Sequence, residues 1–382
     1  MARTGAISPS PPAIDGHDWR LSLVPLPDRA ALAREWRSLE SRGETPFFLT
    51  WDWIGCWLAS IPAGRPPRLL RIERAGRVIG LAVVAQTTHR WLGVMPVRRL
   101  HLHEIGEPAL DSLTIEDNGI LAEPQWREEA SRRAVAWLLT QTDEIRISGV
   151  SAETLQSFGH GLSVRLLDRK PTYAIDLGVT AEAGDFITGL SANTRAQLRR
   201  TIRQFETLGP LRIAAAATRD EAREMLARLI PLHQAYWRGR GKAGAFADPR
   251  IVAFHERLIT ASFDDGRVQF LRCEAGPSTV GYLYNFKNNG RVYAYQSGID
   301  YGLLPRARAG WICHYLAIEE NRRSGMTAYD LLAGENQFKS SFAACETELF
   351  SLIVERRGWR PAIMQALRSA KAFCTSLSLL NR

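Results

Sequence analysis

Apolar and polar positions follow two periods in the second half of the chain. Apolar residues at helical spacing alternate there with short runs rich in Val, Tyr and Phe, which are typical of strands. Turn residues at 275–277 and 288–290 join three of these runs as successive hairpins. The expected elements are helices over 219–241, 247–263 and 309–323 and strands over 268–273, 279–286, 291–298, 328–332 and 348–355.

The first half shows a similar order with a weaker pattern. Two helical segments precede a hairpin, and a further strand, a helix and two strands follow. The expected elements are helices over 30–41, 50–61 and 128–140 and strands over 68–73, 78–87, 98–103, 144–149 and 163–177. A repeated order of elements indicates duplication of one α/β unit.

Length and composition agree with two globular domains. The 382 residues exceed what one core usually organises, and 45% of them are hydrophobic. The clearest apolar run, 78–85, is much shorter than the roughly 20 residues of a membrane-spanning helix. Residues 1–18 are rich in Pro, Ser and Gly without a signal-peptide core, and the five cysteines form no CxxC pair. We therefore expect a disordered lead and a cytoplasmic protein.

A basic loop precedes the expected helix 309–323. The sequence PRARAGW, at 305–311, places two arginines and free backbone N–H groups at a helix N-terminus, which favours a phosphorylated ligand. The corresponding segment of the first half, 103–124, carries six acidic residues and would repel a pyrophosphate. Donor binding is therefore expected in the second half, with a scaffold or acceptor-binding role for the first. A solvent-exposed basic turn remains the alternative for this loop.

Three segments together resemble a known group of enzymes. They are TPFFLTWDWIGCW at 45–57, SANTRAQLRRTIRQFE at 191–206 and YDLLAGENQFK at 329–339. Their order is similar to that of the GNAT acyltransferases, within them the double-domain CelD-like (cellulose-biosynthesis acetyltransferase) family, and to the related Fem aminoacyltransferases. The resemblance implies an α/β fold of two tandem GNAT-like domains, each a mixed, mostly antiparallel twisted sheet flanked by helices. The expected parts are a lead (1–18), an N-terminal domain (19–180), a C-terminal catalytic domain (181–360) and a helical tail (361–382).

The resemblance also implies an acyl-CoA co-substrate, with acetyl as the default acyl group. Its place would be the strand 292–298 and the loop 306–310, although this loop lacks the glycines of the usual Q/R-x-x-G-x-G/A pattern. The implied cofactor-binding residues are Gln296, Ser297, Gly298, Arg306, Ala307, Arg308, Ala309 and Gly310.

Acyl transfer needs an uncharged nucleophile, stabilisation of an oxyanion and a proton for the departing thiolate. Lys339 is a candidate for stabilising the oxyanion and for donating the proton to the thiolate. Backbone N–H groups around 296–298 are further candidates for stabilising the oxyanion. His233 and Asp330 are candidate bases, although a packing role for His233 and an arginine partner for Asp330 are open alternatives. Phe338 has no proton to donate where related patterns have tyrosine. The expected substrate-binding residues are Trp237, Tyr284, Glu335, Asn336 and Phe338.

Two further patterns involve histidines and arginines. His101 and His103 share a strand face and Glu104 follows, but no further ligand accompanies them at informative spacing, so no metal site is expected. Arginines at 195, 199 and 203 repeat along one helix, where an anionic partner or plain solvent would face them.

The sequence therefore predicts a GNAT-type N- or O-acyltransferase that moves an acyl group directly to an amine or hydroxyl. The acceptor would be a small molecule, a saccharide or an envelope or polysaccharide precursor, with no DNA partner. Two alternatives stay open: transfer from aminoacyl-tRNA, as in the Fem enzymes, and a catalytically inactive scaffold in a polysaccharide synthase complex.

Overall fold

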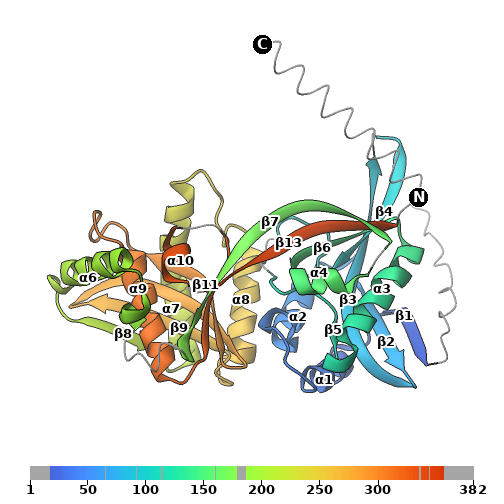
Figure 1. The fold of residues 1–382 in the computed structure, drawn as a ribbon, viewed down its shortest axis with the longest axis horizontal. Coiled ribbons are helices and arrows are strands. Elements are labelled where there is room, and N and C mark those ends of the chain that lie inside the picture. Colours follow the sequence, from blue (N-terminus) through green and yellow to red (C-terminus); the bar gives the residue numbers. More distant parts are fainter. Residues whose placement is uncertain are drawn as a thin grey trace, which may run out of the picture.

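The computed structural model describes residues 18–356, apart from residues 65, 92, 112, 114, 160, 179–185, 335–336 and 344. One mixed sheet of 13 strands runs through this part of the chain (Figure 1). Its strand order is β1-β2-β3-β4-β6-β13-β7-β12-β11-β10-β9-β8, with β5 beside β3. The two halves of the chain thus share one sheet.

Strands and helices are distributed over the whole described part of the chain. The strands are β1 (Trp19–Pro25), β2 (Arg68–Arg74), β3 (Arg77–Trp91), β4 (Met95–Leu102), β5 (Leu121–Ala122), β6 (Glu144–Ser151), β7 (Leu162–Asp176), β8 (Leu211–Ala215), β9 (Val268–Ala275), β10 (Ser278–Asn288), β11 (Arg291–Ile299), β12 (Ala328–Ala333) and β13 (Cys345–Arg356). The helices are α1 (Arg29–Glu40), α2 (Trp51–Leu58), α3 (Arg127–Gln141), α4 (Ala152–Ser157), α6 (Ala192–Glu206), α7 (Arg219–Arg238), α8 (Pro249–Ser262), α9 (Ala309–Arg323) and α10 (Gln337–Phe342), with 3-10 turns η1 (Phe47–Leu49), η2 (Pro124–Trp126) and η3 (Phe186–Gly189).

Each half contains the same strand arrangement. Four antiparallel strands lead to one parallel pair, β4 with β6 in the first half and β11 with β12 in the second. The strand that follows each parallel pair crosses to the other half: β7 pairs with β12, and β13 pairs with β6. β7 and β13 also pair with each other along their length and arch between the halves in Figure 1. This reciprocal exchange joins the two repeats into one sheet.

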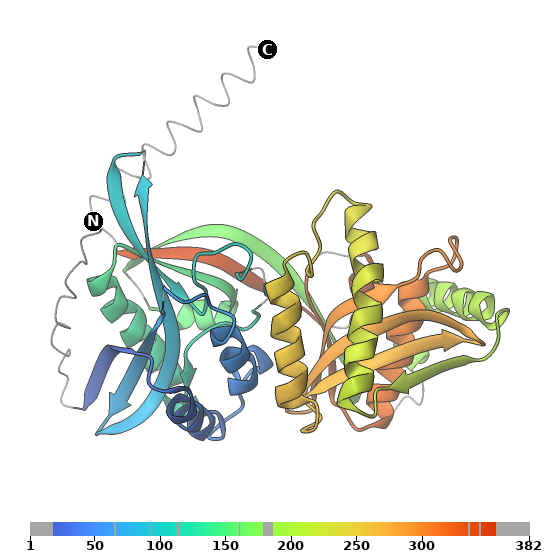
Figure 2. The same ribbon diagram turned by 180° about the vertical axis from the view of Figure 1, so that it is seen from behind.

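Helices cover both faces of the second-half strands. α7 and α8 lie on one face, and α6 and α9 lie on the other (Figures 1 and 2). The apolar side chains of α6 and α9 pack on the sheet in one core cluster, while α3 packs on the first-half strands in another. The third cluster combines α1 and α2 of the first half with α7 and α8 of the second. A hydrophobic core therefore crosses between the halves.

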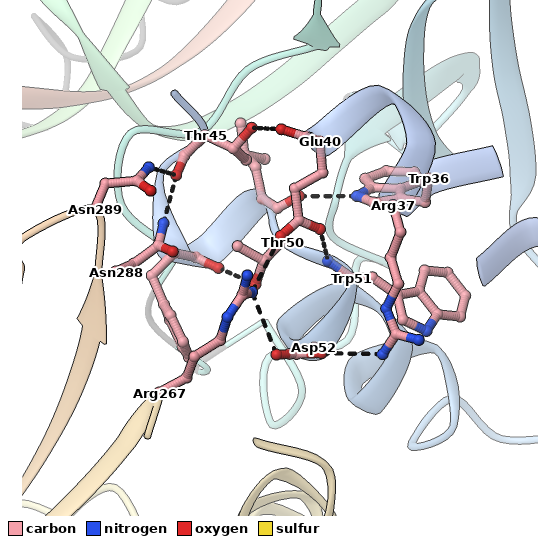
Figure 3. Close-up of polar contacts among 12 residues, drawn as sticks. Trp36, Arg37, Glu40, Thr45, Thr50, Trp51, Asp52, Arg267, Asn288 and Asn289 are labelled. Carbon is pink, nitrogen blue, oxygen red and sulfur yellow. Dashed lines mark hydrogen bonds and ion pairs between the residues drawn. The ribbon is translucent and has the colours of Figure 1, made fainter. Parts of the chain in front are cut away.

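Aromatic and polar contacts hold the segment 45–57 of the first half against the second half. The ring of Phe47 stacks on Phe286 of β10, with centroids 4.3 Å apart. The Arg267 guanidinium donates to Glu40 at 3.0 Å and to Asp52 at 3.3 Å, and the Asn288 side chain donates to the Thr45 carbonyl at 2.6 Å (Figure 3). Buried stacking combined with paired charges makes the two halves one packed unit.

The expected fold class, an α/β fold with a mixed sheet flanked by helices, is confirmed. The structure adds β1, β5, β8 and α4, which the sequence patterns did not reveal. The strand expected at 348–355 forms, but it pairs with β6 of the first half as well as with β7. Residues 1–17, the expected domain boundary at 180/181 and the expected tail lie outside the described residues. Among the helices that are described, none is long and apolar enough to cross a membrane.

Candidate active site

The two parallel strands of the second half separate soon after they meet. β11 and β12 pair only where residues 291–293 face residues 328–330. A bulge in β11 follows at Tyr295, between the positions that face Tyr284 and Asn285 of β10. On β12, Leu332 has a positive φ of 62°, a conformation uncommon outside glycine. Bulge and kink turn the strands apart, so β11 and β12 do not pair beyond these positions.

A pocket of about 1180 Å³ lies at this separation, and we call it the strand pocket. Its walls come from β11, the end of β12, the C-terminal part of α7 and the start of α9. Four cationic side chains line it against two carboxylates: Arg240, Lys242, Arg308 and Lys339 against Glu116 and Asp300. The lining therefore favours an anionic ligand.

The start of α9 faces this pocket. Arg308 occupies the N-cap position, and no side chain caps the helix there. The Arg308 guanidinium lies over the Trp311 ring, 4.5 Å from its centroid, which holds the charge beside the helix N-terminus. Uncapped N–H groups combined with a fixed guanidinium suit a phosphate.

Five of the eight expected cofactor-binding residues line the strand pocket. They are Gln296, Ser297, Ala307, Arg308 and Gly310. Ala309 is buried and Arg306 is exposed outside the lining. Gly298 faces α7 instead, since a Cβ added there would lie 2.4 Å from the Leu229 carbonyl oxygen. Gly298 thus permits the close approach of α7 to β11.

Lys339 of α10 reaches the floor of the strand pocket. Its ammonium group donates hydrogen bonds to the carbonyls of Leu332 and Ala333, each at 2.9 Å. Burial lowers the pKa of Lys339 to about 8, although the carboxylates of Glu116 and Asp330 oppose that shift. An amine with this pKa can release its proton near neutral pH.

Glu116 enters the site from the first half, and sequence reasoning missed it. Its carboxylate accepts a hydrogen bond from the backbone N–H of Ala333 at 2.8 Å. The side chain is only 4% exposed, and burial raises its pKa to about 8, with Asp330 adding to the shift and Lys339 opposing it. Glu116 is therefore a titratable group beside Lys339, at the end of β12.

Asn118 holds the segment that carries Glu116. The Asn118 side chain donates to the carbonyls of Leu102 on β4 at 3.2 Å and Ser148 on β6 at 2.9 Å. Its amide oxygen accepts from Nδ1 of His103 at 2.9 Å. β4 and β6 form the parallel pair of the first half, as β11 and β12 do in the second half. Asn118 therefore joins β4 to β6 at the position that corresponds to the strand pocket between β11 and β12. The acidic segment thus closes the first-half opening and presents Glu116 to the second half.

A second pocket, of about 1020 Å³, lies between the halves, and we call it the acidic pocket. Residues of both halves line it, including Thr45, Asn288 and Asn289. Six carboxylates also line it: Glu44, Glu116, Asp117, Glu128, Glu153 and Asp330. Glu116 lines both pockets, so they meet at its carboxylate.

Asp330 and His233, two of the expected catalytic residues, are both engaged in other contacts. The Asp330 carboxylate accepts from Arg291 at 2.8 Å and from the Leu332 N–H at 2.8 Å. Nε2 of His233 accepts from the Ala245 N–H at 3.2 Å, so its Nδ1 carries the proton and donates to the Ser297 carbonyl at 3.1 Å. Burial also lowers the pKa of His233. This arrangement fixes β11 against α7 and leaves the ring nitrogens occupied.

The expected substrate-binding residues are divided between pocket and core. Trp237 and Phe338 line the strand pocket. Phe338 packs on His314 of α9, another lining residue that sequence reasoning did not single out, with centroids 4.6 Å apart. The structure places Tyr284 in the core, where it is fully buried and its hydroxyl contacts Nδ1 of His255 at 3.2 Å. Glu335 and Asn336 lie outside the described residues.

The histidines considered for a metal have other partners. His101 contacts the Thr87 hydroxyl at 2.8 Å, His103 contacts Asn118, and Glu104 accepts from Ser148 at 2.8 Å. Across the described ranges, no three His, Cys, Asp or Glu side chains are grouped to hold a metal ion.

Comparison with known proteins gives a family match in the second half of the chain and similar folds over most of its length. Residues 192–340 match the model of an acetyltransferase (GNAT) domain, and no curated protein matches the chain. The fold is similar to that of FemX, with 11% identity, a TM-score of 0.54 and coverage of 85% of this chain and 96% of that one. It is also similar to the C-terminal domain of a putative lysylphosphatidylglycerol synthetase from Agrobacterium fabrum, with 10% identity, a TM-score of 0.53 and coverage of 90% and 96%.

A third solved structure shares this fold. L-PGS from Bacillus licheniformis has 10% identity, a TM-score of 0.51 and coverage of 87% of this chain and 94% of that one. At such low identities these likenesses concern the fold alone. Apart from Glu116, all residues that line the strand pocket lie within the matched residues 192–340, and so does the uncapped start of α9. Residues 192–340 are therefore similar to the acetyltransferase domain of GNAT-type acyltransferases.

Proposed function

We propose that the protein transfers an acyl group, acetyl by default, from acyl-CoA to an acceptor held between the two halves. The observation that carries this proposal is the meeting of the strand pocket and the acidic pocket at Glu116, beside Lys339. A donor in one pocket and an acceptor in the other would bring their reacting atoms to that point. Direct transfer then needs no covalent intermediate on the enzyme.

The donor side uses the strand pocket. The pyrophosphate of CoA would lie at the start of α9, near Arg308, and its pantetheine arm would extend along the free edge of β11. Arg240 and Lys242 at the end of α7 supply further positive charge to the pocket lining. In this proposal, backbone N–H groups around 296–298 and the Lys339 ammonium would stabilise the oxyanion.

The chemical step assigns one proton transfer to each of the two titratable groups. The Glu116 carboxylate takes a proton from the acceptor's amine or hydroxyl as that atom attacks the thioester carbonyl. The C–S bond then breaks, and Lys339 gives its proton to the departing thiolate. The pKa of Lys339, about 8, is close to that of an ordinary thiol, about 8.5, so this transfer is nearly balanced. His233 and Asp330 act as positioning residues in this scheme.

Donor binding is the direct test. Titration calorimetry with acetyl-CoA should show binding to the wild type and binding at least about tenfold weaker to Arg308→Ala, because a charge-assisted phosphate contact contributes about 1.5–3 kcal/mol. Arg306→Ala is the matched control, since that side chain is exposed outside the pocket lining. Absence of binding to the wild type at millimolar acetyl-CoA would overturn the proposal. Equal effects of the two substitutions would move the phosphate site elsewhere on the loop.

The finer assignment follows the resemblance to the CelD-like family. We propose a cytoplasmic enzyme whose acceptor belongs to polysaccharide or envelope metabolism. Its two domains would be residues 19–180, on the acceptor side, and 181–360, on the donor side. Turnover of soluble saccharide precursors supports this assignment, whereas donor binding without turnover of any amine or sugar favours the inactive scaffold.

A second candidate is transfer from aminoacyl-tRNA. The side chains of Arg199, Arg200 and Arg203 are exposed on α6, and this basic face favours a nucleic-acid ligand. Mobility shifts with charged tRNA should then weaken steeply with salt, and acetyl-CoA should not compete. Competition by acetyl-CoA, or the absence of a shift at low salt, would exclude this candidate.

A further inference from the structure

We infer that the hairpin formed by β3 and β4 binds the surface of a membrane that contains anionic lipids. This inference goes beyond the proposed function, because no residue of the hairpin lines either pocket. It starts from the charge of the hairpin sequence. Residues 77–103 include four arginines and no aspartate or glutamate. The hairpin therefore favours an anionic partner.

The end of the hairpin projects from the body of the first half. β3 and β4 pair with each other as far as Trp91 and Met95. β2 pairs with β3 no further than Val84, and β6 pairs with β4 only from Arg99 onward. The four residue pairs nearest the turn therefore have no described strand on either side. At about 3.4 Å per residue, this ribbon is roughly 14 Å long. It extends beyond the arch of β7 and β13 in Figures 1 and 2.

Apolar side chains are exposed at the tip of this ribbon. Val94, in the turn, is 75% exposed, more than any other large hydrophobic side chain in the described part of the chain. Met95 is also exposed, and Trp91 lies directly opposite Met95 on the same face of the ribbon. Exposed apolar groups gathered at one projecting point are typical of an interaction site.

Two arginines lie just behind the apolar tip. Arg90 and Arg98 belong to the other face of the ribbon, since side chains alternate between the faces of a strand. Arg90 is exposed, and no ion pair within the described ranges involves it. Arg98 lies 3.5 Å from Asp143, yet 53% of its side chain is exposed. Both guanidinium groups are therefore accessible to an anion, within about 10 Å of the tip along the strands.

This order of side chains matches the layers of a membrane surface. Apolar side chains favour the acyl region, tryptophan favours the interface, and arginine favours the phosphate headgroups. A leaflet that contains anionic lipids attracts the nearby arginines. A stable protein interface usually buries about 800 Å² on each partner, which is much more than a ribbon tip of this size offers. The combination of tip and arginines therefore favours a membrane over a protein partner.

Flotation of the full-length protein with lipid vesicles tests the inference. Vesicles of phosphatidylcholine alone are compared with vesicles in which roughly one third of the lipid is phosphatidylserine. We expect binding to the anionic vesicles at low salt and binding at least about tenfold weaker to the neutral vesicles. High salt should weaken the binding to the anionic vesicles, because it screens exposed charges.

Two double variants separate the apolar contribution from the charged one. Val94→Ser/Met95→Ser removes the apolar tip and should weaken binding about tenfold. Arg90→Gln/Arg98→Gln removes the two charges and should weaken it about twentyfold, since each arginine near an anionic surface contributes about fivefold. The wild-type Tm should be retained in both variants, because the substituted side chains are exposed.

Matched controls come from exposed residues outside the hairpin. Leu166→Ser removes an apolar side chain that is 54% exposed on β7, and Arg228→Gln removes a charge that is 68% exposed on α7. Both controls should bind anionic vesicles as the wild type does. Equal losses in the controls and in the hairpin variants would overturn the inference, because the general surface composition would then account for binding.

Fluorescence quenching locates the contact. Brominated lipids should quench part of the tryptophan emission of the wild type, and this quenching should disappear in Trp91→Phe, which still binds the vesicles. Quenching that persists in Trp91→Phe, or binding that the hairpin variants leave unchanged, would overturn the inference. Absence of binding to anionic vesicles at low salt would also overturn it. These measurements use neither acyl donor nor acceptor, so their outcome is independent of the proposed function.

Discussion

The Glu116 carboxylate and the backbone N–H of Ala333 are hydrogen-bonded at 2.8 Å although 217 residues separate them in sequence. Ala333 ends β12, the strand whose divergence from β11 opens the strand pocket. Glu116 belongs to the segment that closes the corresponding opening of the first half through Asn118. The segment that closes this opening in the first repeat therefore supplies a carboxylate to the opening of the second.

The pH dependence of transfer should reflect Glu116 and Lys339 together. Glu116 acts as a base only when ionised, and burial raises its pKa to about 8, so the rate should rise as pH approaches 8. Lys339 acts as an acid only when protonated, and burial lowers its pKa to about 8, so the rate should fall above that pH. A narrow bell near pH 8 is expected in kcat/KM profiles, with both limbs belonging to the coupled pair.

Single substitutions should show which residue produces each limb of the kcat/KM profile. Glu116→Gln should lower kcat/KM about 10²-fold or more and remove the ascending limb, and Lys339→Met should do the same for the descending limb. Asp168→Asn, on the exposed face of β7, is a control that should leave the profile unchanged. An ascending limb that survives in Glu116→Gln would assign the base to another group.

Glu116 should also lower the stability of the fold at neutral pH. Its pKa is about 8 in the folded state and 4.5 in its ordinary state, so the folded protein binds more protons between these values. Stability from this group is therefore complete below pH 4.5 and is lost as pH rises toward 8. Glu116→Gln, which keeps an oxygen for the Ala333 N–H, should match the wild-type Tm at pH 5 and exceed it at pH 7.5. Equal Tm differences at the two pH values would contradict the buried titration.

Local sequence patterns were sufficient to predict most of the second-half elements. α9 spans the predicted 309–323 because the basic loop precedes it, Arg322 and Arg323 occupy its last turn, and Gly325 follows. The partner of the last strand was not predictable in this way. β13 pairs with β6, about 200 residues earlier in the sequence, and hydrophobic period carries no information about which distant strand becomes a neighbour.

In the candidate site as well, local sequence patterns do not identify the residues that long-range contacts bring together. Local motifs predict Lys339, Trp237 and Arg308, and all three side chains line the strand pocket. Glu116 was missed because the acidity of its segment suggested only repulsion of a phosphate. Its position depends on the three hydrogen bonds of Asn118 and on the packing of the halves, which are long-range contacts. A site formed between two repeats becomes visible only when the repeats are placed together.

Asn118→Leu should separate the position of Glu116 from its chemistry. The substitution leaves the Leu102 and Ser148 carbonyls without their donor inside the protein, at a cost of about 1–3 kcal/mol for each buried group. We expect a lower Tm and a loss of kcat with acetyl-CoA affinity nearly unchanged, because the strand pocket lies in the other half. Chemical denaturation and donor titration measure the two effects. An unchanged kcat in the folded variant would show that Glu116 does not need this anchor.

Phe47→Ala tests whether the first half is part of the active enzyme. The lost stacking on Phe286 leaves a cavity in the core shared by both halves, with an expected cost of about 3–5 kcal/mol. Phe205→Ala is the matched control, since that ring is equally buried but packs within the second half alone. Both variants should lose stability and retain acetyl-CoA binding at low temperature. Only Phe47→Ala should also lose transfer activity, because the contact that holds Thr45 and the acidic pocket against β10 is weakened. Equal activity of the two folded variants would place the whole reaction in the second half.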